Sequence, residues 1–508
     1  MINILEYLEH TLLHHPHKPA FIGENNQLTF NQLHEKACVL GSYLHKNKIY
    51  KQPIAVFMQK SANMVAAFFG AVYGGCYYVP LDAEMPVYRI RQILETVDPS
   101  LIIHDDTTGE LLDTLDISFK RICFNDISSH EADPHALKQI RFMSIDTDPI
   151  YVVFTSGSTG IPKGVTACHR SVINYIEQLS IVLDINESTI FGNQSPLYLD
   201  ACLKELLPTI KFGATTYFIP KSLFLFPVKL IEYINEHKIN TICWVASALG
   251  LVAGLGAFKK AIPHTLRCIA FGSEVFAIKH LNQWREAIPH ARFVHLYGPT
   301  EATGMSLYYI LDRHFSEEET IPIGQPFQNT GALLLDENNN LPAMGESGEI
   351  CIRGTGLCLG YYNDPKRTAE AFVQNPLSPY ADIIYKTGDL GRVDAQGLYY
   401  FIARKDHQIK HMGYRIELTE IEWVAARLTG IQLACAIYDD EKSRIILFYM
   451  AAEDTEKSVI HAALKNELPR YMQPHAIFPL EKLPQTPGGK IDRVALKTYY
   501  RRELSPCY

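Results

Sequence analysis

The stretch TSGSTGIPKG, residues 155–164, directly follows the apolar segment PIYVVF, residues 149–154. The apolar segment predicts a buried strand because it is short and rich in β-branched and aromatic residues. The loop after it offers many backbone N–H groups, four hydroxyls and one cation, Lys163, which together suit a polyphosphate. A solvated turn is the alternative for any loop rich in glycine and serine. The P-loop motif GxxxxGK[ST] is absent, since Pro162 precedes the lysine and Gly164 follows it.

Short runs of β-branched and aromatic residues alternate with helical patterns along most of the chain. Buried strands are predicted at residues 215–219, 241–245, 267–271 and 292–297, and amphipathic helices at residues 221–238 and 277–289. This alternation predicts an α/β fold with layered sheets and helices. Loops rich in Gly, Ser, Thr or Pro follow several of these strands, which is where ligands of open α/β sheets bind.

The pattern changes after about residue 404, where a shorter α+β segment begins. We therefore predict a large amino-terminal part over residues 1–404 and a small carboxy-terminal domain over residues 405–508. The uncharged stretch at residues 62–81 has the length of a membrane span, but Gly74-Gly75 and Pro80 break it. It is predicted to form a buried helix, a turn and a strand, without membrane insertion.

Composition excludes several classes of protein. The chain has 508 residues, of which 47% are hydrophobic and 20% charged, which is typical of a globular protein with large cores. The formal net charge of -8, without a run of Lys or Arg, argues against nucleic acid as a partner. The eleven cysteines are dispersed in mostly apolar runs without a CxxC pair, which predicts reduced, mostly buried thiols in a cytoplasmic protein.

The loop at residues 155–164 resembles the phosphate loop of the adenylate-forming superfamily, which comprises acyl-CoA synthetases, luciferases and the adenylation domains of peptide synthetases. Further stretches resemble the superfamily in the expected order: LTFNQL (28–33), GGCYYVPLDAEMPVYR (74–89), FGSE (271–274), YGPTEAT (297–303), GEICIRGTGLCLGYYNDPKRTAEAF (348–372), YKTGDLGR (385–392), ARKDHQIKHMGYRIELTEIE (403–422) and PQTPGGKIDR (484–493). The resemblance covers nearly the whole chain. It implies the adenylate-forming enzyme fold, with ATP and Mg²⁺ as cofactors.

Several side chains suit a nucleotide. Tyr297 offers a flat apolar face for a purine, and Glu301 offers a hard oxygen ligand for Mg²⁺, although a single glutamate is more often a surface charge. Asp389 can accept hydrogen bonds from the vicinal hydroxyls of ribose or simply cap a turn. The resemblance implies adenine stacking for Tyr297, Mg²⁺ ligation for Glu301 and ribose binding for Asp389, with Arg404 as a second nucleotide contact and Asp406 as the hinge.

The resemblance places the whole nucleotide site on sixteen residues: Thr155, Ser156, Ser158, Thr159, Lys163, Gly272, Ser273, His295, Leu296, Tyr297, Gly298, Pro299, Thr300, Asp389, Arg404 and Lys490. Lys490 lies in a Gly-Gly loop near the chain end, where a lysine is by default a solvated surface residue. The resemblance implies instead that its ammonium reaches the carboxylate and the α-phosphate, where negative charge develops in the transition state. The predicted catalytic set is Lys490, Thr155, Lys163 and Glu301.

Asp200, at the start of a predicted helix, indicates which class of carboxylic acid the enzyme activates. Burial of a carboxylate in apolar surroundings is unfavourable without a partner, so a cationic group of the substrate is one candidate partner of Asp200. The alternative is that Asp200 only caps the helix. The position resembles that of an aspartate that pairs with the α-ammonium of the substrate in amino-acid-activating members. The implied substrate pocket comprises Asp200, Ala201, Lys204, Trp244, Ile269, Phe271, Leu296, Gly304, Met305 and Lys490.

The identity of the amino acid stays open. The volumes of Trp244 and Phe271 predict a small side chain, and the chain resembles D-alanine:carrier-protein ligases most. Lys204 and Phe271, however, depart from the residues usual in those ligases. Lys204 either points to solvent or pairs with an acidic substrate side chain.

The sequence thus predicts a ligase that converts an amino acid and ATP into aminoacyl-AMP and pyrophosphate. Only RRELSPCY follows residue 500, so we expect the second step to use the phosphopantetheine thiol of a separate carrier protein, or coenzyme A. An acyl- or aryl-CoA ligase of the same fold is the first alternative. A non-catalytic nucleotide sensor is the second, because a fold alone does not establish turnover.

Overall fold

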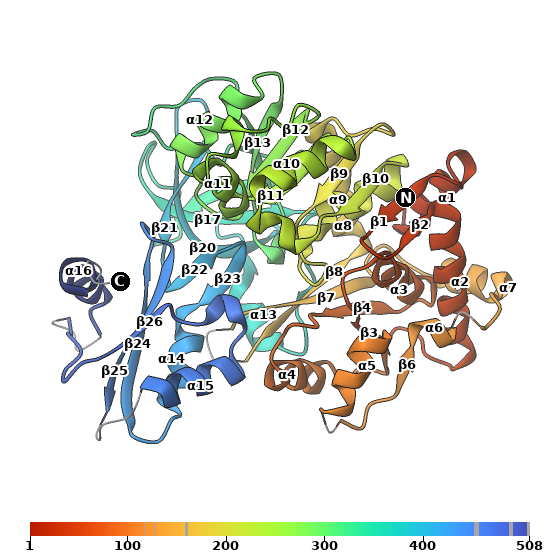
Figure 1. Cartoon of the computed structure of the whole chain (residues 1–508), viewed down its shortest axis with the longest axis horizontal. Helices are drawn as coiled ribbons and strands as arrows, with labels where there is room; N and C mark the ends of the chain where they lie inside the picture. Colours follow the sequence, from red (N-terminus) through yellow and green to blue (C-terminus); the bar gives the residue numbers. More distant parts are fainter. Residues whose placement is uncertain (116, 128, 158–160, 452–456, 487–490, 505–508) are drawn as a thin grey trace. The chain divides into compact units, whose positions relative to one another are not determined.

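The computed structural model of the chain describes residues 1–115, 117–127, 129–157, 161–451, 457–486 and 491–504 (Figure 1). The chain divides into two compact units. Unit 1 comprises Met1–Ala83, Val97–Val153 and Gly164–Lys405, and unit 2 comprises Glu84–Thr96, Phe154–Lys163 and Asp406–Tyr508. The domain boundary after residue 404 and the hinge at Asp406 stay predictions.

Two large sheets form the centre of unit 1. The nine-stranded sheet has the order β15 (Gln325–Pro326), β14 (Leu307–Ile310), β13 (Arg292–Tyr297), β12 (Cys268–Gly272), β11 (Thr241–Val245), β9 (Ile190–Asn193), β10 (Thr215–Phe218), β1 (Pro19–Ile22) and β2 (Gln27–Thr29). The seven-stranded sheet has the order β18 (Gly360–Tyr361), β8 (Lys163–Cys168), β7 (Pro149–Thr155), β4 (Tyr77–Leu81), β3 (Pro53–Phe57), β5 (Leu101–His104) and β6 (Arg121–Cys123). All four strands predicted between residues 215 and 297 are present, and the α/β class is confirmed.

Helices cover these sheets. Those of unit 1 are α1 (Leu5–His14), α2 (Phe30–Lys46), α3 (Ala62–Tyr73), α5 (Asp106–Asp113), α6 (Phe124–Ile127), α7 (Pro134–Met143), α8 (His169–Leu183), α9 (Leu203–Phe212), α10 (Pro227–Glu236), α11 (Ala246–Gly254), α12 (Ile278–Ala287) and α13 (Pro365–Ala371). The predicted helix at residues 277–289 is α12. The one predicted at residues 221–238 is wrong in extent, since α10 begins at Pro227, a residue that favours the first turn of a helix, after a 3₁₀ turn at Lys221–Leu225.

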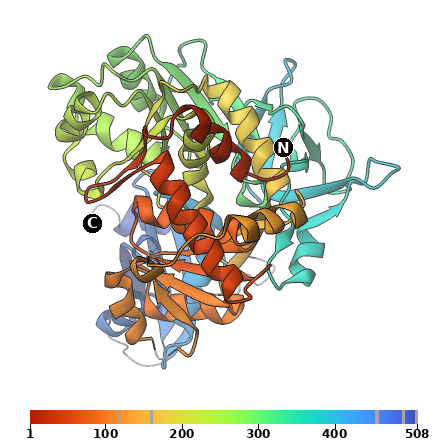
Figure 2. The ribbon, with the colours of Figure 1, turned by 90° about the vertical axis from the view of Figure 1, so that its right-hand side faces the viewer.

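The uncharged stretch at residues 62–81 forms α3, a turn and β4, as predicted. Helices α1, α2 and α3 pack together at the amino-terminal end of unit 1 (Figures 1 and 2). Glycine is required where α2 meets α3, because a Cβ atom on Gly70 would lie 2.5 Å from Leu40 Cδ2. Nowhere in the described part of the chain is a helix both long enough and apolar enough to cross a membrane.

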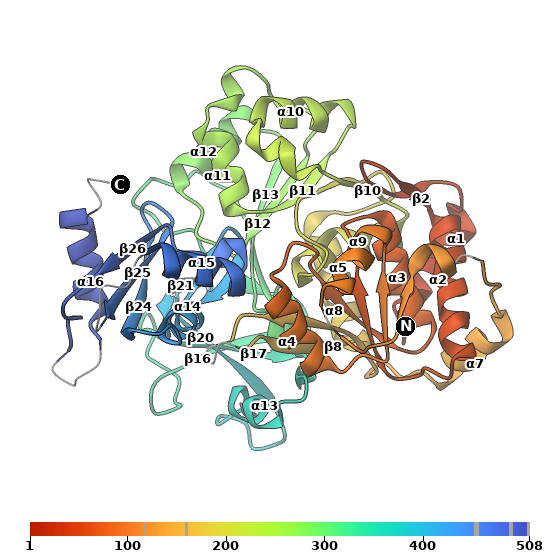
Figure 3. The ribbon, with the colours of Figure 1, turned by 60° about the horizontal axis from the view of Figure 1, so that its bottom comes forward.

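Helices α10, α11 and α12 cover one face of the β11–β12–β13 region (Figures 1 and 3). Strand residues alternate between this face and the opposite one. Trp244, Ile269 and Phe271 belong to the core beneath α10–α12, whereas Cys243 and Ala270 belong to the larger core on the other face.

A five-stranded antiparallel sheet completes unit 1: β16 (Thr330–Leu335), β17 (Gly348–Gly354), β19 (Phe372–Gln374), β20 (Ile383–Val393) and β21 (Tyr399–Arg404). Asp389 lies within β20, not in the turn that its neighbouring glycines suggest. It pairs directly with Arg404 on β21, so the ladder fixes these two residues opposite each other.

Unit 2 contains a three-stranded sheet with helices on both faces (Figure 3). The strands are β24 (Ile431–Asp439), β25 (Arg444–Ala451) and β26 (Ala476–Pro479), and the helices are α14 (Leu418–Ala426), α15 (Lys457–Glu467) and α16 (Arg493–Tyr499). Along β24, Ala434 and Ala436 pack with α14 and α15, while Cys435 and Ile437 pack with α16. These strands and helices have the α+β character that the sequence predicts after residue 404. A hairpin of β22 (Gln408–His411) and β23 (Tyr414–Glu417) precedes α14.

A buried ion pair joins two segments of unit 2. Arg89, on α4 (Val87–Val97), pairs with Glu420 on α14, and both side chains are at most 5% exposed. Burial raises the pKa of Glu420, while Arg89 lowers it. The other Glu420 oxygen accepts a hydrogen bond from the backbone N–H of Gly157 at 3.3 Å.

Removing one partner of this pair leaves the other charge buried and uncompensated. We expect Arg89→Met and Glu420→Gln each to lower the free energy of unfolding by about 3–5 kcal/mol, and the double variant to lose less than the sum. The surface pair of Arg427 and Glu467 is the matched control, and its removal should cost at most about 1 kcal/mol. Equilibrium urea denaturation measures all of these variants. Strictly additive losses for Arg89 and Glu420 would contradict the coupling.

Candidate functional site

The carboxyl ends of β12 and β13 carry a cluster of the predicted site residues. The two strands are parallel neighbours with Gly272 opposite Leu296, so the segments that follow them leave the sheet at one edge. A Cβ atom on Gly272 would lie 2.2 Å from the Leu296 carbonyl oxygen, and one on Gly298 would lie 2.4 Å from the Gly304 carbonyl oxygen. Glycine is therefore required at both positions, and the chain after Tyr297 folds back tightly.

Tyr297, Asp389 and Arg404 come together in unit 1. The Tyr297 hydroxyl donates a hydrogen bond of 2.5 Å to one oxygen of Asp389, and Arg404 donates one of 2.7 Å to the other. Burial, together with the charge of Asp389, raises the pKa of Tyr297 well above its usual range. Both oxygens of Asp389 are thus engaged, and the ring of Tyr297 is held in one orientation.

Glu301 is fully buried in the 3₁₀ turn Thr300–Ala302 that follows β13. Its Oε1 accepts a hydrogen bond of 2.7 Å from the hydroxyl of Tyr361 on β18. Tyr361 is a neighbour of the site that the sequence did not predict, although it lies in the stretch at residues 348–372 that resembles the superfamily. A carboxylate oxygen suits Mg²⁺, and the described residues offer no cluster of three His, Cys, Asp or Glu for a metal. Any metal held by Glu301 would take its remaining ligands from a bound phosphate or from water.

Asp200 lies at the start of the 3₁₀ turn Asp200–Cys202 that leads into α9. Burial raises the pKa of its carboxyl group, while the Thr300 hydroxyl and the Lys204 ammonium act in the opposite direction. Lys204 follows one helical turn later, and Glu301 lies close enough to Asp200 to raise its pKa further. The turn after β13 and the start of α9 therefore form one charged cluster.

The next residue, Glu205, is fully buried. Its Oε2 accepts a hydrogen bond of 2.8 Å from Asn193 Nδ2, while Oε1 has no partner among the described residues. Burial raises the pKa of Glu205 to about 7, although the nearby Lys204 ammonium lowers it. The Glu205 carboxyl group is therefore partly protonated near neutral pH.

Tyr175, on α8, also belongs to this cluster, and the sequence did not predict it as a site residue. Its ring lies against Gly304, where a Cβ atom would be 3.3 Å from Tyr175 Cζ. The hydroxyl is buried and has no hydrogen-bond partner in the part of the chain that the structure describes. The alternation of apolar and polar residues along α8 marks Tyr175 only as a buried position, so no sequence signal indicated a site residue.

The predicted pocket residues divide between two cores. Leu296 and Met305 share the core of Tyr175 and Leu203, and Gly304 contacts Tyr175. Trp244, Ile269 and Phe271, by contrast, face α10–α12. The Trp244 indole N–H donates a 2.7 Å hydrogen bond to the Gly192 carbonyl oxygen, and the Phe271 ring stacks on His295 with centroids 5.1 Å apart. Next to Trp244, Cys243 faces Glu205 and Tyr175 instead. Ala201 is half-buried beside Asp200.

The predicted phosphate loop is described only in part, and within unit 2. Thr155 Oγ1 is buried without a partner among the described residues, and Lys163 begins β8. The Ser156 hydroxyl donates a 2.6 Å hydrogen bond to the Arg415 carbonyl oxygen and accepts a 3.2 Å one from the Glu417 N–H. The Gly157 N–H donates a hydrogen bond to Glu420. The segment from β23 to α14 thus bonds to both Ser156 and Gly157 of the loop. Ser158, Thr159 and Lys490 lie outside the described residues.

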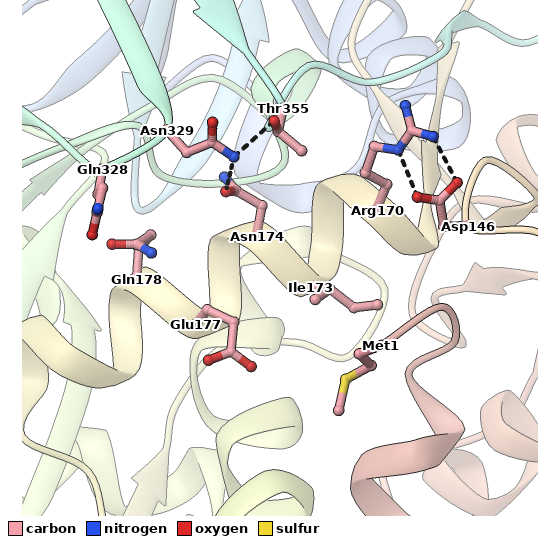
Figure 4. Close-up of a pocket in the computed structure, with 10 residues that line it drawn as sticks. All are labelled: Met1, Asp146, Arg170, Ile173, Asn174, Glu177, Gln178, Gln328, Asn329 and Thr355. Atoms are coloured by element: carbon pink, nitrogen blue, oxygen red, sulfur yellow. Dashed lines mark hydrogen bonds and ion pairs between the residues drawn. The ribbon is translucent and has the colours of Figure 1, made fainter.

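A surface cavity of about 610 Å³ lies along α8 in unit 1 (Figure 4). None of the predicted site residues lines it. Its polar groups largely bond to one another: Asn329 donates 2.9 Å hydrogen bonds to Asn174 and Thr355, and Arg170 pairs with Asp146 (Figure 4). Asn174 and Tyr175 thus point from α8 into different surroundings, the first into this cavity and the second into the core.

Comparisons with known proteins show the family and the fold of this chain. The family model described as AMP-binding enzyme matches residues 8–362. Tyrocidine synthase 3 of Brevibacillus parabrevis is 32% identical over 499 residues, which are 97% of this chain and 8% of that protein. The chain thus spans less than a tenth of the length of this relative.

Two solved structures share the fold. The NRPS protein holo-PA1221, which contains adenylation and PCP domains, is 25% identical with a TM-score of 0.84, over 97% of this chain and 84% of that one. The o-succinylbenzoate CoA synthetase MenE of Bacillus subtilis is 20% identical with a TM-score of 0.84, over 98% of both chains. The predicted adenylate-forming enzyme fold is confirmed.

The raised pKa of Glu205 has a consequence for stability. A carboxyl group with a raised pKa binds its proton more tightly in the folded state, so its contribution to the free energy of unfolding falls as the pH rises from about 4.5 to about 7. Glu205→Gln cannot ionise. We expect the variant to gain stability relative to the wild type as the pH rises through this window, measured by urea denaturation at pH 5, 6, 7 and 8. A difference that is constant with pH would contradict the raised pKa.

Proposed function

The chain belongs to the AMP-binding enzyme family, and from this premise we propose that it activates the carboxyl group of an amino acid. In the proposed reaction a carboxylate oxygen attacks the α-phosphorus of ATP, forming an acyl–phosphate bond. The bond from the α-phosphorus to the bridging oxygen breaks, and the electron pair leaves with pyrophosphate. The product is an aminoacyl-AMP mixed anhydride.

The position of Asp200 carries the proposal that the acid is an amino acid. Its carboxyl group lies beside Thr300 and Glu301, at the turn where the nucleotide residues begin, and burial disfavours its charged form. A cationic partner offsets that cost, and the α-ammonium of an amino acid is such a cation. The same contact would place the substrate carboxylate near the turn after β13.

The nucleotide would use the residues that the sequence predicts. Tyr297 is held by Asp389 in one orientation and would stack on the adenine, with Gly272, Ser273, His295, Leu296, Gly298, Pro299 and Thr300 around it. Asp389 would bind the ribose hydroxyls, which compete there with Tyr297 and Arg404. Thr155, Ser156, Ser158, Thr159 and Lys163 would hold the phosphates.

Two further roles complete the proposal. Glu301 would ligate Mg²⁺, which neutralises charge on the departing pyrophosphate. Lys490 would contact the carboxylate and the α-phosphate and then leave the site as the chain moves about Asp406. The aminoacyl group would then pass to the phosphopantetheine thiol of a carrier protein, which the PCP domain of holo-PA1221 supports, or to coenzyme A.

Amino-acid-dependent exchange of labelled pyrophosphate into ATP tests the function. We expect exchange with at least one amino acid when the proteinogenic set and D-alanine are assayed. Exchange with none of them, together with turnover of a fatty or aryl acid and coenzyme A, would replace the proposal by an acyl- or aryl-CoA ligase.

Asp200→Ala tests whether Asp200 contacts the substrate or has only a structural role. The variant should raise KM for the amino acid and leave KM for ATP nearly unchanged, because only the α-ammonium loses its partner. Pyrophosphate exchange at varied amino acid and varied ATP measures both constants. Equal increases in the two would assign Asp200 a structural role.

Lys490→Ala tests the proposed transition-state contact. We expect adenylation to slow by at least about 10²-fold, the scale of losing one charge contact in the transition state. Lys482→Ala, in the same carboxy-terminal region, is the control and should keep the wild-type rate. A wild-type rate for Lys490→Ala would remove this lysine from the mechanism.

A further inference from the structure

Lys204 is a buried lysine in the cluster next to Asp200. The residue is 2% exposed, which excludes the solvent-directed alternative that the sequence left open. Among the described residues of unit 1 its ammonium has electrostatic neighbours but no hydrogen bond or ion pair. Asp200 and Glu205 are close enough to interact with it electrostatically. A cation is therefore held inside the protein without a bonded anion.

Tyr175 supplies a second polar group at the same place. Its buried hydroxyl has no partner among the described residues, and its ring lies against Gly304. The Tyr175 hydroxyl and the Lys204 ammonium share four ionisable neighbours, which are Asp200, Cys202, Glu205 and Cys243. Two unbonded donors thus have the same ionisable neighbours, one of which is Asp200, the residue proposed to hold the α-ammonium.

The charges in this region indicate which chemical group Lys204 and Tyr175 would bind. Without substrate, Asp200 offsets the charge of Lys204 one helical turn away. When an α-ammonium binds Asp200, that carboxylate no longer serves Lys204 alone. Glu301 is bonded to Tyr361, and Glu205 compensates poorly because it is partly protonated, bonded to Asn193 and shared with the Lys60 ammonium. A second anion would give Lys204 a bonded partner, and a buried cation without one is strongly unfavourable.

We propose that the amino acid activated by this enzyme carries an acidic side chain, whose carboxylate accepts hydrogen bonds from Lys204 and Tyr175. This inference rests on the proposed function and specifies its substrate class. Asp200 and the side-chain carboxylate provide two anions, and the α-ammonium and Lys204 provide two cations. An amide side chain of the same shape would leave Lys204 uncompensated.

The first test uses the wild-type protein and isosteric substrates. Pyrophosphate exchange is measured with aspartate, asparagine, glutamate and glutamine, each as both enantiomers. We expect kcat/KM for one acid to exceed that of its own amide by at least about 10²-fold, the scale for a site with buried polar groups left unpaired. Preference for an amide over both acids would overturn the inference and leave amino acid activation standing. Exchange with no amino acid would overturn the proposed function itself.

Two variants test the side chains. Lys204→Met keeps a similar length without the charge, and it should remove the preference for the acid over the amide, with KM for ATP unchanged. Tyr175→Phe removes only the hydroxyl, and it should raise KM for the acid about tenfold with little change in kcat. Lys211→Met is the matched control on α9, since Lys211 pairs with Glu177 outside the cluster, and it should keep the wild-type preference.

The pattern across substrates separates a side-chain contact from a structural role. A Lys204→Met variant that slows exchange equally with the acid and its amide would overturn the assignment of Lys204. If that variant does not fold, the acid-to-amide ratio of the wild type and of Tyr175→Phe still decides the inference. Unchanged KM for the acid in Tyr175→Phe would remove the hydroxyl from the site.

Discussion

The site of unit 1 depends on the burial of charge. Lys204, Glu205, Glu301 and Asp389 are each at most 3% exposed, at a depth where an ion without compensation is strongly unfavourable. Asp389 is compensated by Arg404, and Glu301 accepts a hydrogen bond from Tyr361. Burial raises the pKa of Glu205, so that its charged form is less populated. Lys204 alone among these four makes no hydrogen bond or ion pair within the described residues.

Strands, and the loops that follow them, could be predicted from the sequence. The apolar runs that become β10, β11, β12 and β13 are short and bounded by Gly, Pro or polar residues, so local composition determines them. The glycines at 272 and 298 mark the tight approaches at the carboxyl ends of β12 and β13. Residues far apart in sequence, such as Tyr297, Asp389 and Arg404, were grouped only by resemblance to a family. The direct hydrogen bonds between these residues could not be predicted from the sequence.

Other features could not be predicted because they depend on which face of a strand or helix meets which neighbour. Trp244 and Cys243 are adjacent in sequence, yet pleating sends them to different cores. Tyr175 reads as an ordinary buried position on α8, and only the fold places it against Gly304. The predicted turn at Asp389 is a strand, since pairing with β21 outweighs the turn preference of its flanking glycines.

The hydrogen bond from Gly157 to Glu420 would lower the affinity of the loop at residues 155–164 for an anion. The Gly157 N–H already has a carboxylate as its acceptor, and Ser156 is bonded on both sides by the chain around Arg415 and Glu417. A phosphate that used these groups would replace one acceptor by another, so its apparent affinity would be lowered by competition within the same molecule. Because Glu420 also pairs with Arg89, its release from Gly157 would have to keep or break that ion pair. If the loop binds an anion, that binding would be coupled to the ion pair between Arg89 on α4 and Glu420.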